Sequence, residues 1–136
     1  MIKINSLSIG NYVYYNNEHN EIGVITEIKT SINPNIDYIG LNNRVDIYYQ
    51  LKHIKGIPLT EEWLFKFDFK LIIESSNISK WFIGYNPITH DYLFIITQFI
   101  DENRFFFKNG FHTIKHIHEL QNLYFALTGE ELTLNK

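Results

Sequence analysis

The sequence predicts an α+β protein that is built mostly from antiparallel strands. Short segments rich in β-branched and aromatic residues recur in both halves of the chain, separated by turns that contain Asn, Asp, Gly or Pro. Two other segments, one near the middle and one near the C-terminus, show helical spacing. We therefore expect a small barrel over residues 1–57, then a helix, a second sheet and a C-terminal helix over residues 58–136, with one shared core.

Four strands are expected in the first part. They cover Asn11–Tyr15, Glu21–Lys29, Tyr38–Leu41 and Val45–Ile54, and the last of these is a long strand or a strand pair. The segment SIGNYVYYNN, followed by EIGVITEI with a glycine inside the strand, is similar to the opening of an SH3-like barrel. Several short strands at this spacing are typical of a small barrel or a curled sheet.

The segment LTEEWLFKF predicts a helix of about two turns. Thr60 is a suitable N-cap, and Glu61 and Glu62 follow in the first turn, where carboxylates interact favourably with the helix dipole. We expect the buried anchors of this helix to be Trp63, Leu64 and Phe67.

A second group of strands is expected over Phe69–Glu74, Trp81–Tyr85, Tyr92–Gln98 and Arg104–Lys108. Asn109-Gly110, between FFFK and FHTI, predicts a hairpin that pairs Phe107 with His112. Strand alternation then gives the hairpin two faces. The expected core face carries Phe105, Phe107, His112, Ile114 and His116. The other face carries Arg104, Phe106, Lys108, Phe111, Thr113 and Lys115.

The segment that starts at Ile117 predicts the C-terminal helix, and Gly129 occupies the position of a C′ glycine. Apolar residues recur along it at helical spacing: Ile117, Leu120, Leu123, Tyr124 and Leu127. Gln121 and Asn122 fall outside this stripe. They either form hydrogen bonds with solvent or backbone groups, or they contact a partner.

The composition disfavours a nucleic-acid-binding protein and excludes some other classes. The formal net charge is −3, whereas a domain that binds duplex nucleic acid usually carries a basic face. The absence of Cys excludes disulfides and zinc–thiolate sites. No run approaches the ~18–20 apolar residues of a membrane span, and the opening residues lack a signal-peptide pattern. We therefore expect a soluble, cytoplasmic protein.

No catalytic motif is visible, because the chain lacks a GxSxG segment and any glycine-rich phosphate or dinucleotide loop. His112 and His116 stand four residues apart on a strand, which separates them by ~13 Å and prevents them from sharing one metal. His116 and His118 could approach each other, but an obvious third ligand is missing. We expect no catalytic residue, no metal and no cofactor.

Tyrosines form the best candidate for a binding surface. Tyr12 and Tyr14 share one face of their strand, and a later strand adds Tyr48 and Tyr49. Ordinary strand propensity explains these residues as well, but small barrels also bind peptides or single strands through such rows, and protein interfaces favour tyrosine. The candidate partner-binding surface therefore comprises Tyr12, Tyr14, Tyr48, Tyr49, Gln121 and Asn122.

Two segments resemble parts of small uncharacterised proteins of bacterial genomes, phages and mobile elements: IPLTEEWLFKF, over Ile57–Phe67, and HELQNLYFALTGEEL, over His118–Leu132. Those proteins also open with a β-rich stretch similar to IGNYVYYNN. Some proteins of that general type are anti-CRISPR or other anti-defence inhibitors. The resemblance implies a small stand-alone protein and brings no catalytic residue with it.

Three functional hypotheses follow. The first is a non-enzymatic protein-binding domain, which the resemblance extends to an anti-CRISPR type of inhibitor whose partner is a host defence nuclease or a ribonucleoprotein. The second is an SH3-like nucleic-acid-binding module that uses Tyr12, Tyr14, Lys29, Arg44 and Lys52. The third is an enzyme whose site combines scattered Asp, His and Tyr residues. The oligomeric state is left open.

Overall fold

The computed structural model describes residues 2–16, 20–30, 37–75, 79–85, 92–99, 104–107 and 112–134. The chain divides into two compact units, one of Met1–Ile57 with His116–Asn122 and one of Pro58–Lys115 with Leu123–Lys136. Each unit contains a five-stranded sheet, and every described strand pair is antiparallel. The predicted α+β class is therefore confirmed. The boundary between the two units falls inside the C-terminal helix, between Asn122 and Leu123. The sequence pattern does not predict a boundary there.

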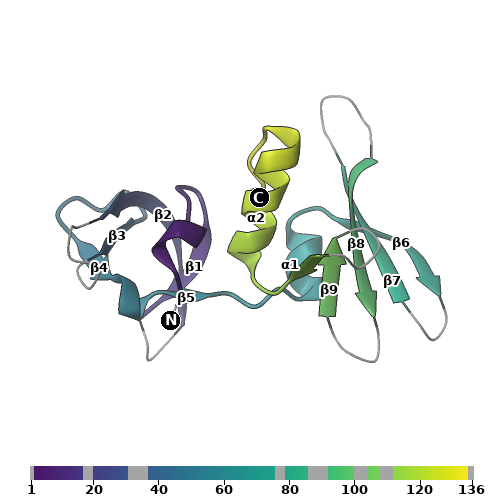
Figure 1. Cartoon of the computed structure of the whole chain (residues 1–136), viewed down its shortest axis with the longest axis horizontal. Helices are drawn as coiled ribbons and strands as arrows, with labels where there is room; N and C mark the ends of the chain where they lie inside the picture. The colour runs from purple at the N-terminus through teal and green to yellow at the C-terminus, as the bar shows by residue number, and fades with distance from the viewer. Residues whose placement is uncertain are drawn as a thin grey trace. The chain divides into compact units, whose positions relative to one another are not determined.

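The first unit holds a sheet with the strand order β4-β3-β2-β1-β5 (Figure 1). Its elements are η1 (Ile4–Ser6), β1 (Tyr12–Tyr15), β2 (Glu21–Lys29), β3 (Tyr38–Leu41), β4 (Tyr48–Gln50), η2 (Leu51–His53) and β5 (Lys55–Gly56). The expected segment Val45–Ile54 is interrupted, because Asp46 has a φ of 64° in a turn and η2 follows β4. In the described residues this sheet is not closed, so the SH3-like barrel stays a prediction.

The core of the first unit lies on one side of this sheet. Val13 and Tyr15 are buried, whereas Tyr12 and Tyr14 are only half-buried, so the predicted alternation along β1 is confirmed. The buried cluster consists of Leu7, Val13, Tyr15, Ile25, Ile39, Leu41 and Ile54. One face of β1 is therefore committed to this cluster, and Tyr12 and Tyr14 lie on its other face.

The second unit begins with α1 (Glu61–Lys66). The Thr60 side-chain oxygen accepts a hydrogen bond from the Trp63 backbone N–H at 3.3 Å, which confirms the predicted N-cap. The predicted anchors Trp63, Leu64 and Phe67 are all buried. The ring centroids of Trp63 and Phe67 lie 5.7 Å apart, so the two residues anchor this short helix together.

The sheet of the second unit is a meander with the order β10-β9-β8-β7-β6. Its strands are β6 (Lys70–Ser75), β7 (Ser79–Tyr85), β8 (Tyr92–Phe99), β9 (Arg104–Phe107) and β10 (His112–Ile114) (Figure 1). The predicted pairing of Phe107 with His112 is confirmed, and the turn Asn109-Gly110 lies outside the described residues. Phe105 and Ile114 are buried as expected, but in the next pair on this face Phe107 is half-buried and His112 is exposed, so burial decreases along the described part of the hairpin.

The C-terminal helix α2 covers Ile117–Thr128. Gly129 follows it with a φ of 75°, which confirms the predicted C′ glycine, since L-residues with a side chain rarely adopt this conformation. The predicted apolar stripe is buried at Ile117, Leu120 and Tyr124, but Leu127 is 55% exposed. That part of the stripe prediction is wrong, because burial of the helix face ends one turn before its C-terminus.

Candidate binding surfaces

The outer face of β1 and β2 carries a group of aromatic and aliphatic side chains. Tyr12 lies opposite Val24, and Tyr14 lies opposite Ile22. Directly opposed residues of antiparallel strands project from the same face, so these four side chains are neighbours. Ile22 is 45% exposed, and the other three are half-buried. We call Tyr12, Tyr14, Ile22 and Val24 the tyrosine patch.

Tyr48 and Tyr49 belong to different faces of β4. Tyr49 lies opposite the buried Ile39, and its ring centroid is 5.1 Å from that of Tyr15, so it packs on the core side. Tyr48 lies opposite Gly40 and points to the outer face. Of this pair, only Tyr48 extends the surface that the sequence predicts, because adjacent strand residues project in opposite directions.

Tyr48 takes part in a small charged cluster. Its hydroxyl donates a hydrogen bond to Glu27 Oε2 at 3.0 Å, and Lys29 Nζ lies 4.2 Å from its ring centroid. Lys29 Nζ also lies 3.8 Å from Glu27 Oε1. The contact with Tyr48, more than the nearby Glu27 carboxylate, raises the pKa of Lys29. The positive charge of Lys29 is therefore balanced locally by Glu27.

Gln121 and Asn122 use their side-chain amides inside the first unit. Gln121 Oε1 accepts a hydrogen bond from the Tyr12 backbone N–H at 2.8 Å, and its Nε2 donates one to the Gly10 carbonyl at 3.0 Å. Asn122 Oδ1 accepts from Asn11 Nδ2 at 2.9 Å. The sequence allows two roles for these side chains, hydrogen bonding to solvent or backbone groups and contact with a partner. The hydrogen bonds of Gln121 to backbone groups correspond to the first role. They hold β1 in place rather than form part of the tyrosine patch.

The imidazole rings of His116 and His118 stack, with centroids 5.5 Å apart and an interplanar angle of 19°. His116 Nδ1 lies 3.0 Å from Glu119 Oε1. His118 is buried, and this burial, with the smaller effect of the neighbouring His116, lowers the pKa of His118. Within the described residues, no group of three or more His, Asp or Glu side chains is arranged to hold a metal ion.

Gly56 provides the space for this histidine pair. It lies opposite Val13, so a side chain at position 56 would project toward the buried face. An ideal Cβ at Gly56 would lie 2.8 Å from His116 Cδ2 and 3.0 Å from His118 Cε1. The close approach of the two rings to the backbone therefore requires glycine at this position.

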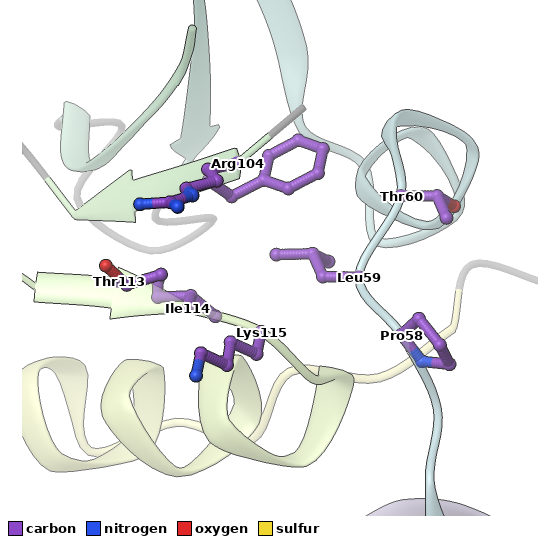
Figure 2. A pocket seen from close by; sticks show the side chains of 8 residues that line it. Pro58, Leu59, Thr60, Arg104, Thr113, Ile114 and Lys115 are labelled. Carbon is purple, nitrogen blue, oxygen red and sulfur yellow. The ribbon is translucent and has the colours of Figure 1, made fainter. Parts of the chain in front are cut away.

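A pocket of about 540 Å³ opens in the second unit (Figure 2). The described residues that line it are Pro58, Leu59, Thr60, Arg104, Phe105, Thr113, Ile114 and Lys115. Leu59, Phe105 and Ile114 are buried, whereas Arg104 and Lys115 are exposed. The sequence places Arg104, Thr113 and Lys115 on a common face but gives no signal for the part of the pocket that residues 58–60 contribute.

No protein-family model, curated protein or solved structure matches this chain at a significant level. The resemblance to mobile-element proteins therefore stays a prediction. In the part of the chain that the structure describes, no helix combines the length and the apolar character that crossing a membrane requires.

Proposed function

We propose that this chain is a protein-binding domain and that the tyrosine patch contacts the partner. The observation that carries the proposal is the cross-strand pair of Tyr14 and Ile22 on the outer face of the first sheet. Ile22 remains 45% exposed beside a half-buried tyrosine, on a face opposite to the one that holds the core.

The chemistry of the patch suits a protein partner. Tyrosine offers a large apolar ring together with a hydroxyl that forms hydrogen bonds, and it is enriched in the buried centres of protein interfaces. Tyr12 and Tyr14 are held on a strand that pairs on both sides, with β2 and with β5. The backbone of a strand that is paired on both sides loses little conformational freedom when a partner binds.

The charges around the patch favour a protein over a nucleic acid. Residues 1–57 contain five Lys or Arg and five Asp or Glu, so their formal charges sum to zero. Nucleic-acid binding derives much of its affinity from the release of counterions by unbalanced positive charge. Lys29 is one of the cations that a nucleic-acid-binding module would use. Its Nζ lies 3.8 Å from Glu27 Oε1, and both side chains are exposed, so the carboxylate of Glu27 offsets the charge of Lys29 at the surface.

The proposal includes the finer expectations from the sequence: the partner is a host defence nuclease, the domain acts as its inhibitor without catalysis of its own, and it works in the cytoplasm. The resemblance of the segments Ile57–Phe67 and His118–Leu132 to mobile-element proteins supports the first two of these.

A photo-crosslinking experiment tests the proposal. Azidophenylalanine is placed at Tyr14, in the tyrosine patch, and separately at Glu62, an exposed position on α1. Both proteins are irradiated in lysates of cells that carry the gene, one untreated and one treated with nuclease. We expect position 14, but not position 62, to give a discrete protein adduct. An adduct that disappears after nuclease treatment would instead indicate the nucleic-acid-binding module.

A further inference from the structure

We infer that the partner of the tyrosine patch presents a carboxylate to Lys55, next to the apolar group that covers Tyr14 and Ile22. This inference rests on the proposed protein-binding function and adds the charge of the partner to it. Lys55 belongs to β5, the strand at one edge of the first sheet. The lysine and the patch together form a surface that is cationic at one end and apolar at the other.

The strand register places Lys55 in one row with the centre of the patch. Tyr14 lies opposite Lys55 on one side and opposite Ile22 on the other. Directly opposed residues of antiparallel strands project from the same face, so the three side chains follow one another across the sheet. Neighbouring strands are about 4.8 Å apart, which puts the backbones at Lys55 and Ile22 roughly 10 Å from each other.

The burial of the neighbouring residues agrees with this orientation of Lys55. Ile54, which has an extended backbone, is 2% exposed and belongs to the core cluster of the first unit. Gly56 lies opposite the buried Val13. Because side chains alternate along an extended segment, Lys55 projects away from the core, and it is exposed. Its ammonium group is therefore on the face that carries the patch.

The charge of Lys55 is not balanced within the described part of the chain. Among the described residues, its ammonium group has neither an ion-pair partner nor a hydrogen-bond partner. Lys29, elsewhere on the same face, has the carboxylate of Glu27 at 3.8 Å. Glu21 lies opposite Tyr15, so it projects from the other face of the sheet. A bound partner can therefore supply the anion that Lys55 lacks.

A protein carboxylate is the anion that best suits this row. A partner that covers Tyr14 and Ile22 also removes water from the neighbouring Lys55, and a cation that loses water without a compensating group costs free energy. A carboxylate opposite the lysine compensates this cost and fixes the register of the partner, which a non-directional apolar contact does not. Nucleic acids carry a phosphate at every nucleotide and are bound by several cations, so a single unbalanced lysine suits a protein better.

Charge reversal in the full chain tests the inference. The protein with azidophenylalanine at position 14 is irradiated in the nuclease-treated lysate, after addition of unlabelled wild-type, Lys55→Glu or Lys52→Glu protein. Lys52 is an exposed residue of η2, outside the sheet, and its reversal changes the net charge by the same amount. We expect that about tenfold or more Lys55→Glu than wild type is needed to halve the adduct, because attraction becomes repulsion, and that Lys52→Glu competes as the wild type does. Thermal unfolding of each variant confirms that it is folded.

A charge exchange completes the test. Mass spectrometry of the adduct identifies the partner segment, and each Asp or Glu in and next to that segment is replaced by Lys in the purified partner. One such replacement should weaken binding of the wild type and strengthen binding of Lys55→Glu about tenfold. Equal competition by folded Lys55→Glu, an equal loss in Lys52→Glu, or failure of every replacement to restore binding would overturn the inference and leave the proposed function standing. Absence of any adduct at position 14 would overturn both.

Discussion

Gln121 Oε1 accepts a hydrogen bond from the backbone N–H of Tyr12 at 2.8 Å, although 109 residues separate the two in the sequence. The same side chain donates to the Gly10 carbonyl, so one carboxamide satisfies both a donor and an acceptor of the main chain at the start of β1. Gln121 is 5% exposed. The strand that carries Tyr12 and Tyr14 is therefore fixed by a buried group of α2.

Replacement of Gln121 by Ala should lower the free energy of unfolding by about 1–3 kcal/mol, because it leaves two backbone groups without their hydrogen-bond partner. Gln121→Leu should be destabilised similarly, since it restores the volume but not the hydrogen bonds. Urea unfolding measures both, with the exposed Gln50→Ala as a control that should change stability by less than ~0.5 kcal/mol. A Gln121→Leu variant as stable as the wild type would show that these hydrogen bonds contribute little.

Gly56→Ala should destabilise the first unit by about 1–3 kcal/mol, because the added methyl group would overlap the rings of His116 and His118. Denaturant unfolding measures this loss, and Lys55→Ala, at the exposed neighbouring position, should have little effect. In a double-mutant cycle, His116→Ala should reduce the cost of Gly56→Ala, since it removes the nearest ring atoms. Strictly additive effects would contradict this account of the glycine.

His118 should make the stability of the protein depend on pH. Because its folded pKa is lowered below the ordinary value of 6.5, the unfolded chain binds the proton more readily than the folded one. This contribution to stability is fully present above pH 6.5 and is lost as the pH falls through the folded pKa. Unfolding midpoints measured between pH 8 and pH 5 should therefore decrease toward low pH.

His118→Leu, which has a similar volume, should reduce this pH dependence, and the exposed His112→Gln should retain it. His116 and Glu119 are the titratable groups that act on His118, the first lowering its pKa and the second raising it. The account would be wrong if His118→Leu kept the full decrease in stability at low pH.

Local sequence signals predict the local features of this fold. The cap of Thr60, the glycine after α2, the pairing of Phe107 with His112 and the alternation along β1 all depend on a few neighbouring residues, and all are confirmed. The same period-two rule separates Tyr48 from Tyr49, so the position of Tyr49 on the core side could have been predicted from the sequence.

The features that depend on distant contacts could not be predicted. No local pattern indicates that Gln121 reaches Tyr12, or that the segment at Leu59 runs beside Lys115. The strand alternation of β2 also shifts at a register irregularity between Ile25 and Glu27, which moves Glu27 to the face of Tyr48. The charged cluster on that face and the pocket of the second unit therefore became visible only in the structure.

A competition experiment tests the central claim most directly. Formation of the adduct at position 14 is competed, before irradiation, with unlabelled wild-type protein, with the double variant Tyr14→Thr/Ile22→Thr, and with Lys70→Thr as a control. Loss of about 2 kcal/mol at an interface hot spot corresponds to about 30-fold in affinity. We predict that the double variant, while still folded, requires about 30-fold or more protein than the wild type or the control to suppress the adduct. Equal suppression by all three proteins would contradict the assignment of partner binding to the tyrosine patch.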